Sequence, residues 1–264
     1  MMKLSDCTLL WNREVSPGYY HMGLEAPARY TEAAPGQFVM LKAEKGGTLL
    51  RRPFSIHDVT TQGDKTVVTL LYKVVGPNTR VYAGMKEGDV LSMLGPLGNR
   101  FTEPQAGETT FLAGGGIGIA PMLLLARRIL AKGGSPSDHT VFIGGRTRED
   151  VLAEEAFREL GFPVVVTTDD GSAGEKGRIT APMARLLNEK NPAKVYACGP
   201  HPMLVGVADL MDGHDALCEL SLEIIMACGM GACMGCVVES SDEDAPYRHV
   251  CIDGPVFDAR TIKV

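Results

Sequence analysis

The sequence has few aromatic residues and no large excess of charge of either sign, and both shortages argue against a nucleic-acid-binding protein. Aromatic residues make up 6% of the 264 residues, which is little for a surface that stacks on bases. The 26 Lys and Arg against 32 Asp and Glu give a formal net charge of -6, which repels phosphate backbones unless basic residues cluster. The sequence shows no basic stripe, so we expect no nucleic-acid partner.

Long hydrophobic runs are also scarce. The segment 109–126 carries no charge and just reaches the length of a membrane-spanning helix, but four glycines and a proline interrupt it. We predict a short strand, a glycine turn and an apolar helix there, all buried in an α/β core. The first residues lack a basic stretch followed by an apolar one and a small-residue cleavage site. The sequence therefore predicts a cytoplasmic protein without a membrane segment.

Hydrolytic motifs are missing as well. The sequence contains no G-x-S-x-G elbow and no H-E-x-x-H helix, and its six histidines are dispersed. A single histidine is more often a surface or core residue than a catalyst. We therefore predict no catalytic side chain of the hydrolase type.

The pattern of short segments divides the chain into three parts. Residues 7–94 form short β-type runs separated by glycine and proline, which predicts a small antiparallel β-barrel. Strands and helices alternate over 109–211, which predicts a parallel sheet covered by helices, and the polar segment 102–108 is the expected linker. The tail is rich in Cys and Met. We expect a multidomain chain with domains at 1–103, 104–215 and 216–264.

The tail contains the most specific motif. Cys228, Cys233, Cys236 and Cys251 follow the C-x4-C-x2-C spacing with a distant fourth cysteine, which is the plant-type pattern for a [2Fe-2S] cluster. Glycines between them let the backbone approach the sulfurs. Structural zinc is the alternative, but zinc sites usually pair their ligands in two short turns, whereas three cysteines share one loop here.

Two further runs are suited to binding phosphates. Gly114, Gly115, Gly116 and Gly118 follow an expected strand and precede an apolar helix, where free N–H groups favour an anion. The strict G-x-G-x-x-G fingerprint is not met, and a glycine turn can also be purely structural. The Arg-Arg-Pro-Phe-Ser-Ile run at 51–56 offers guanidinium groups to a pyrophosphate, although such a pair at a strand edge is often only a solvated surface.

The order of these features along the chain carries more information than any one of them. A barrel with the Arg-Pro-Phe-Ser run is followed by the glycine run, by Cys198-Gly199-Pro200 and by the cysteine tail. This order resembles the ferredoxin-NADP reductase superfamily. Within it the chain is similar to the electron-transfer subunits of class 1B dihydroorotate dehydrogenases, over essentially its whole length.

The resemblance implies that the barrel binds FAD. The residues matching the family's FAD-binding segments are Arg52, Pro53, Phe54 and Ser55, then Leu71, Tyr72 and Lys73, and in a phosphate-binding turn Asn78 and Thr79. The family often has Gly where Asn78 stands, and Asn tolerates a left-handed backbone better than most residues. The glycine run would hold the phosphates of NAD, and Cys198 would lie near the nicotinamide.

The resemblance also implies a function. Electrons would pass between NAD and FAD, then through the [2Fe-2S] cluster to an FMN-containing catalytic subunit that oxidises dihydroorotate in pyrimidine (UMP) biosynthesis, in a heterotetramer with two copies of each chain. NADP stays open, because Arg146 and Arg148 follow the second strand of the nucleotide domain. Other possibilities are a flavin and iron-sulfur reductase subunit serving ferredoxin or a hydrogenase, and a non-enzymatic redox sensor.

Overall fold

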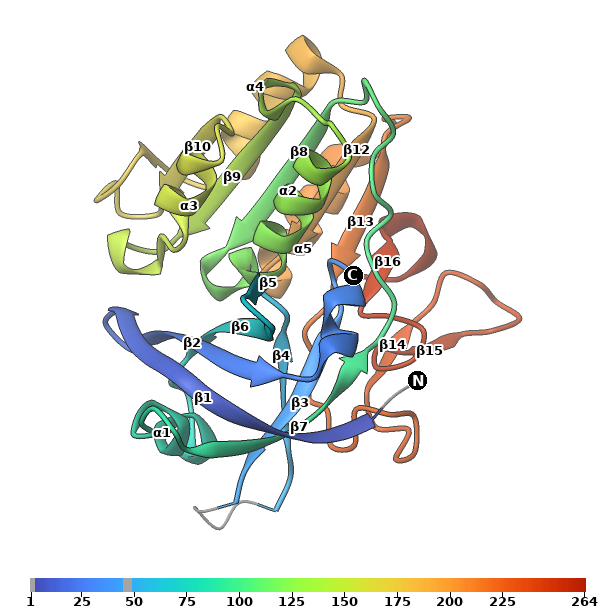
Figure 1. Ribbon diagram of the computed structural model, residues 1–264. Helices are drawn as coiled ribbons and strands as arrows, with labels where there is room; N and C mark the ends of the chain where they lie inside the picture. The colour runs from blue at the N-terminus through green and yellow to red at the C-terminus, as the bar shows by residue number, and fades with distance from the viewer. Residues whose placement is uncertain (1–2, 45–48) are drawn as a thin grey trace.

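The computed structural model describes residues 3–44 and 49–264. In Figure 1 the helix-covered sheet lies above the curled sheet, and the C-terminal segment lies beside both. Over the described ranges no helix combines the length and the apolar character needed to cross a membrane. The multidomain fold class expected from the sequence is confirmed.

The N-terminal part is a seven-stranded antiparallel sheet in the order β4-β3-β7-β1-β2-β6-β5, curled with its edges at β4 and β5. Its strands are β1 (Lys3–Ser16), β2 (Tyr19–Ala26), β3 (Phe38–Ala43), β4 (Arg52–Ser55), β5 (Asp58–Gln62), β6 (Lys65–Lys73) and β7 (Val90–Leu97), with the short helices η1 (Ala28–Glu32) and α1 (Pro77–Ala83). Strand β6 lies between β2 and β5, consists mostly of apolar and β-branched residues, and is almost wholly buried.

The second part is a parallel sheet with helices on both faces. Its strands are β8 (Thr110–Gly115), β9 (His139–Gly145), β10 (Val164–Thr168), β11 (Glu175–Lys176), β12 (Lys194–Cys198) and β13 (Leu217–Ser221). Its helices are η2 (Gly116–Ile119), α2 (Ala120–Ala131), η3 (Pro136–Asp138), η4 (Arg148–Asp150), α3 (Glu154–Glu159), α4 (Thr180–Lys190) and α5 (His201–Met211). The sheet order is β11-β10-β9-β8-β12-β13-β16, so the connections reverse direction between β8 and β12. Open α/β sheets bind ligands at such a switch point.

The C-terminal part has little regular structure. It contains β14 (Val237–Glu239), β15 (Tyr247–His249), β16 (Val256–Asp258) and η5 (Ala259–Thr261). Strand β16 pairs antiparallel with β13 and so extends the nucleotide sheet. Strand β13 lies beyond the expected boundary at residue 215, yet it pairs with β12 in that same sheet. The nucleotide sheet therefore continues to Ser221.

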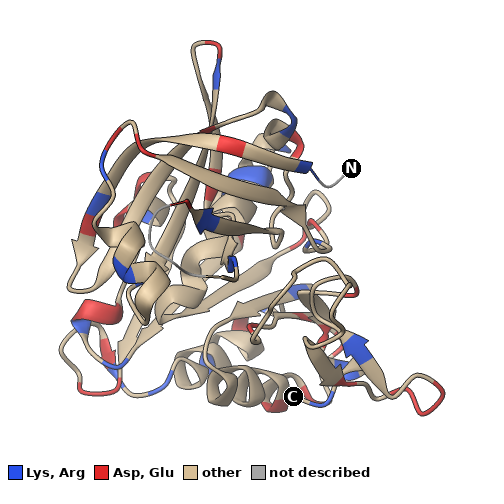
Figure 2. Cartoon of the chain, turned by 90° about the horizontal axis from the view of Figure 1, so that it is seen from below, with Lys and Arg blue, Asp and Glu red and all other residues tan. Residues whose placement is uncertain are grey.

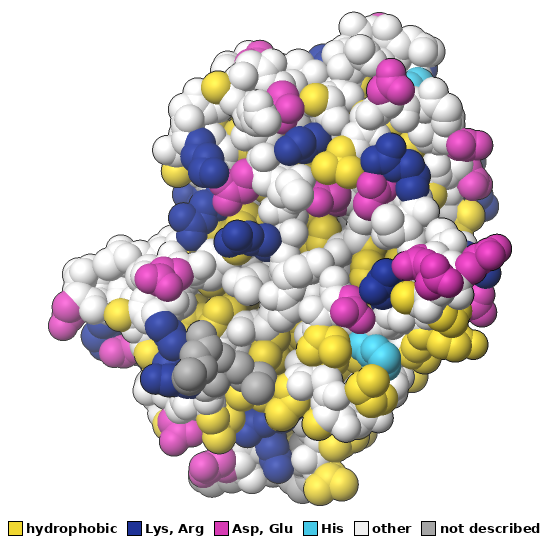
Figure 3. All heavy atoms as spheres, turned by 90° about the vertical axis from the view of Figure 1, so that its right-hand side faces the viewer, with side chains coloured by type: hydrophobic (Ala, Val, Ile, Leu, Met, Phe, Trp, Pro, Cys, Tyr) yellow, Lys and Arg dark blue, Asp and Glu magenta, His cyan; other side chains and the backbone are white. Residues whose placement is uncertain are grey.

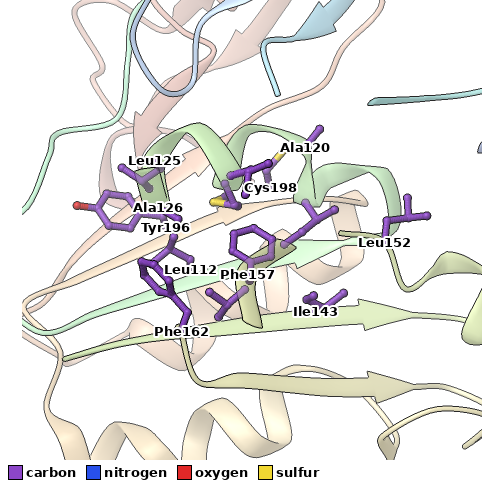
Figure 4. Packing of buried hydrophobic residues seen from close by; sticks show 14 of the residues in the cluster. Leu112, Ala120, Leu125, Ala126, Ile143, Leu152, Phe157, Phe162, Tyr196 and Cys198 are labelled. Carbon is purple, nitrogen blue, oxygen red and sulfur yellow. The ribbon is translucent and has the colours of Figure 1, made fainter. Parts of the chain in front are cut away.

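The uncharged segment 109–126 folds as β8, η2 and α2. Its helix is buried because residues of α2 and α3 pack together on one face of the sheet. Figure 4 shows this packing, with Leu112, Ile143, Phe157 and Cys198 in one cluster. A strand, a turn and a helix replace the single membrane span that the length alone would allow.

Candidate functional site

The first large cavity, of about 650 Å³, lies between the curled sheet and the segment that follows β13. It is lined by every residue that the sequence assigned to FAD, namely Arg52, Pro53, Phe54, Ser55, Leu71, Tyr72, Lys73, Asn78 and Thr79. These residues come from β4, β6 and α1, which are separate in the sequence. The fold therefore gathers the predicted flavin residues around one space.

The two neighbouring arginines play different parts. Arg52 lines the cavity, and its guanidinium is bonded only loosely, to the carbonyl oxygens of Leu50 at 3.3 Å and Arg51 at 3.0 Å. Arg51 turns to β7, where Nη1 donates to the carbonyl of Ser92 at 2.6 Å and Nη2 to its Oγ at 3.1 Å. Arg52 is thus the one of the pair placed to bind an anion in this cavity.

Aromatic side chains form one wall of this cavity. The rings of Phe54 and Tyr72 meet edge to face, with centroids 5.8 Å apart and planes at 72°. Tyr72 also stacks on Tyr20 at 5.6 Å. This packing fixes the rings before any ligand arrives, as suits a site for a flat aromatic group.

The turn before α1 forms another wall. Thr79 Oγ1 accepts hydrogen bonds from the backbone N–H groups of Val75 at 2.9 Å and Gly76 at 3.0 Å. Asn78 is buried and its amide donates to the carbonyl of Leu50 at 3.1 Å. Because Asn78 lies within α1 and does not have a positive φ, the left-handed backbone considered for this position is not required.

The second cavity, of about 600 Å³, lies at the carboxyl ends of the parallel strands. A row of glycines from neighbouring strands forms its floor: Gly144 of β9 pairs with Gly115 of β8, and Gly199 follows β12 on the other side of β8. Without side chains, these positions let a ligand approach the backbone closely. At one end of the row Thr167 pairs with Gly144.

Thr167, near the end of β10, is a residue that the sequence analysis did not single out. Its side chain is buried, it lines the second cavity, and its hydroxyl has no hydrogen-bond partner. A buried hydroxyl without a partner is unfavourable, so it is suited to bonding a ligand. Asp169, just beyond the strand, lines the same cavity.

Only some of the residues that the sequence analysis assigned to NAD line the second cavity. Gly115 and Gly116 line the second cavity, whereas Gly114, Gly118 and Cys198 lie behind its wall. Cys198 is fully buried against α2, and this burial raises the pKa of its thiol well above the ordinary value (Figure 4). In this structure Cys198 supports the cavity wall but does not line the cavity.

The two cavities meet. Lys73, Ile117 and Glu223 line both of them. A ligand in one cavity can therefore reach a ligand in the other at this junction.

The four tail cysteines come together in one loop region. Backbone N–H groups of Met230 and Cys233 donate to Cys228 Sγ, each at 3.4 Å, and that of Gly231 donates to Cys251 Sγ at 3.2 Å. The N–H of Cys251 in turn donates to Cys236 Sγ at 3.4 Å. Backbone donors of this kind surround sulfurs that hold iron-sulfur clusters and tune them. These N–H groups lower the pKa of Cys228 to about 6.

The cysteine loop adopts the backbone that its glycines permit. Gly229 and Gly231 have φ of +70° and +80°, which side chains disfavour. A Cβ on Gly229 would stand 2.5 Å from Cγ of Met40 in β3, so the loop rests on the curled sheet. Within the described ranges no three His, Cys, Asp or Glu side chains converge on a point suited to one metal ion. A two-iron cluster, unlike zinc, spreads its four thiolates over two metals.

Comparisons with known proteins agree with this architecture. Residues 112–209 match the family model of the oxidoreductase NAD-binding domain, and residues 223–263 match the iron-sulfur cluster binding domain of dihydroorotate dehydrogenase B. A solved structure described as an NADH-dependent reduced ferredoxin-NADP oxidoreductase superposes with a TM-score of 0.84 at 29% identity, covering 97% of this chain and 89% of that one. A ferredoxin NADP+ reductase from Neisseria gonorrhoeae shares the fold, with a TM-score of 0.68 at 17% identity over 83% of this chain and 99% of that one. The fold and the cavities thus define an oxidoreductase of the ferredoxin-NADP reductase type with an added iron-sulfur domain.

The relatives narrow this class. The dihydroorotate dehydrogenase B (NAD(+)) electron transfer subunits of Caldanaerobacter subterraneus and Desulforamulus reducens are each 38% identical, over 96% and 97% of both chains respectively. That of Bacillus velezensis is 38% identical over 99% of both chains. The chain belongs to the family of dihydroorotate dehydrogenase B electron transfer subunits. The resemblance inferred from the sequence is confirmed.

Proposed function

We propose that this chain carries electrons between NAD and the FMN of a dihydroorotate dehydrogenase catalytic subunit, using FAD in the first cavity and a [2Fe-2S] cluster on the four tail cysteines. The observation that carries the proposal is the continuity of the three sites. The cavities share Lys73, Ile117 and Glu223, and the first cavity is also lined by Ile224, Ile225 and Met226, which lead directly to Cys228.

The residues present fit FAD and NAD. Arg52 offers a guanidinium for phosphate oxygens, while Phe54 and Tyr72 offer apolar ring surface, within one cavity. Gly115 and Gly116 precede α2, where free N–H groups suit the phosphates of NAD. When bound, FAD would exchange a hydride with the nicotinamide and single electrons with the cluster, so the redox chemistry would belong to the cofactors.

The chain's own residues orient and enclose these groups. Ile117 covers the junction with apolar surface, and Glu223 lies beside it. Cys228 receives backbone hydrogen bonds that stabilise its thiolate, and Cys251 receives one from Gly231, although burial raises the pKa of Cys251 to about 12. No side chain has to act as a general base. The site residues assigned here, and the division of the chain at residue 103, are part of the proposal, whereas the pairing of β13 with β12 moves the second boundary from residue 215 to beyond Ser221.

The catalytic subunit has to reach the cluster, and the tail offers a surface for it. Exposed hydrophobic side chains of the tail include Ile225, Met230, Met234, Val237, Tyr247 and Ile252. Figure 3 shows hydrophobic side chains gathered on the lower part of this face. Charged residues do not gather in the same way: in Figure 2, Lys and Arg are interspersed with Asp and Glu along the chain. We propose that the FMN-containing partner docks on this tail surface, in a heterotetramer with two copies of each chain.

The test is the anaerobic visible spectrum of the purified chain before and after NADH is added. We expect flavin and iron-sulfur absorbance that bleaches with NADH, and NAD-linked dihydroorotate oxidation only when the catalytic subunit is present. A colourless zinc protein, or a coloured one that NADH does not reduce, would contradict the proposal. Dihydroorotate oxidation by the isolated chain would contradict the assigned partner, and electron delivery to ferredoxin alone would favour the ferredoxin-linked alternative.

A further inference from the structure

A buried carboxylate joins the nucleotide domain to the curled sheet. Asp150 ends η4, and its side chain is buried. Its Oδ1 accepts a short hydrogen bond from the hydroxyl of Tyr19, and its Oδ2 accepts one from the backbone N–H of Arg146 at 3.1 Å. Burial opposes the charge, but these hydrogen bonds and nearby Lys73 hold the pKa of Asp150 below its usual value.

Two residues of the curled sheet complete the network. Tyr19 of β2 and Lys73 of β6 are paired across antiparallel strands. The Lys73 Nζ donates to the Tyr19 hydroxyl at 2.6 Å and lies 3.5 Å from Oδ1 of Asp150. The three polar groups thus form a closed triangle across the domain boundary. Charge-assisted hydrogen bonds of this kind are stronger than neutral ones and are little screened when buried.

The ring of Tyr19 strengthens the same connection. It is 3% exposed and belongs to a hydrophobic cluster that joins Leu71 of the curled sheet to nucleotide-domain residues such as Ile119 and Leu152. Tyr19 therefore packs at the boundary between the curled sheet and the nucleotide domain. Its hydroxyl donates to Asp150, and this fixes the position of the end of the side chain.

The triangle lies where the two cavities meet. Tyr19, Lys73 and Asp150 all line the second cavity, and Lys73 also lines the first. A small change in the angle between the domains would therefore change the distance between ligands in the two cavities. Hydride transfer depends steeply on that distance, since a misplacement of about 1 Å can reduce a rate about 100-fold.

We propose that Tyr19 and Asp150 are positioning residues, which through Lys73 fix the nucleotide domain against the curled sheet in the orientation that brings nicotinamide to the flavin. This inference rests on the proposed function, because it assumes NAD and FAD in the two cavities. Neither Tyr19 nor Asp150 is proposed to contact the reacting atoms. Their effect is on the rate of hydride transfer.

The test is anaerobic stopped-flow reduction of the flavin by NADH in the assembled complex with the catalytic subunit. The variants are Tyr19→Phe, which keeps the ring in the core, and Asp150→Asn, which keeps the shape of the side chain. Ser16→Ala is the matched control, because Ser16 Oγ donates to the carbonyl of Glu149 at 2.8 Å across the same boundary but outside both cavities. FAD content, iron content and melting temperature are measured for each variant.

We expect both variants to lower the limiting rate of flavin reduction about tenfold or more, with full FAD and iron content and with a smaller change in the Kd for NADH. The double variant should lose little more than either single one, since the residues act as a unit. Ser16→Ala should keep the rate. Variants with a lowered melting temperature but an unchanged limiting rate would overturn the inference. Failure of NADH to reduce the unaltered complex would instead overturn the proposed function.

Discussion

The carbonyl oxygen of Cys198 lies 2.3 Å from the position that a Cβ atom on Gly118 would occupy. The carbonyl carbon of Cys198 and the Cα of Gly199 lie 2.5 Å from the same position. All three are backbone atoms, which cannot move aside as a flexible side chain could. The glycine run and the Cys-Gly-Pro run, far apart in the sequence, are therefore packed directly against each other at the switch point of the sheet.

Gly118→Ala should therefore be destabilising. The added methyl group forces η2 away from β12, and overpacking of this kind costs about 1–3 kcal/mol. Because η2 borders the second cavity, the Kd for NADH should rise as well. Thermal unfolding and NADH titration measure the two effects. Gly84→Ala is the control, since its Cβ would meet nothing closer than 3.6 Å. Equal stability of the two variants would contradict the packing described here.

Replacing the two neighbouring arginines should have separate effects. Arg52→Ala should lose FAD on purification, because its guanidinium is the one that lines the first cavity. Arg51→Ala should keep FAD but unfold at a lower temperature, because it removes the two hydrogen bonds to Ser92. The ratio of flavin to protein, read from the visible spectrum, shows which of the two arginines is needed to retain FAD. Loss of FAD from Arg51→Ala alone would reverse the assignment.

Cys233→Ser should abolish the cluster. Cys233 belongs to the proposed ligand set, and serine is a poor ligand for iron in such a cluster. We expect loss of bound iron and of NAD-linked dihydroorotate oxidation, while NADH still reduces the FAD. Cys218→Ala is the control, since Cys218 is buried in the nucleotide core and should leave iron content unchanged. Retention of iron in Cys233→Ser would exclude this cysteine as a ligand.

Thr167→Val should change stability and affinity in opposite directions. Removing a buried hydroxyl that has no partner should leave the ligand-free protein as stable or more stable. Losing a hydrogen bond to the nucleotide should raise the Kd for NADH roughly 2- to 10-fold. Thr168→Val is the matched control: the Thr168 hydroxyl donates to the carbonyl of Ala173 at 2.8 Å and accepts from its N–H at 3.0 Å, so that variant should lose stability. An unchanged Kd in Thr167→Val would show that the hydroxyl does not bind nucleotide.

The stability of the protein should fall in mild acid. His57 is buried with its Nδ1 2.7 Å from the carbonyl oxygen of Ala120, and burial lowers its pKa from 6.5 to about 4. Below pH 6.5 the unfolded chain takes up a proton that folded His57 does not, so stability decreases until about pH 4. The expected loss is about 3 kcal/mol. Neighbouring His21, whose pKa is also lowered to about 4, adds to it.

Urea unfolding at several pH values measures this dependence. His57→Gln removes the titrating group and keeps an amide that can donate to Ala120. Its stability should fall less between pH 6.5 and 4 than that of the unaltered chain. An identical pH dependence in both proteins would show that His57 does not cause it.

The sequence alone determined the parts of the molecule that depend on local pattern. Alternating apolar runs predicted the two sheets, and α4 and α5 lie within 109–211, where the sequence predicts strands alternating with helices. The cysteine spacing predicted the cluster, because one loop has to present three thiolates at fixed intervals. The order of the motifs indicated the family. Local spacing is sufficient where the residues of a site are neighbours along the chain.

Tertiary structure decided how distant segments meet. It separated Arg52 from Arg51, buried Cys198 behind the cavity wall and left the hydroxyl of Thr167 without a partner. It also extended the nucleotide sheet with β13 and β16, and it joined Tyr19, Lys73 and Asp150 across the domain boundary. No repeating pattern of residues in the sequence indicates any of these relationships. They arise from pairing and packing between segments far apart in the chain, 131 residues in the case of Tyr19 and Asp150, and become visible only once the chain is folded.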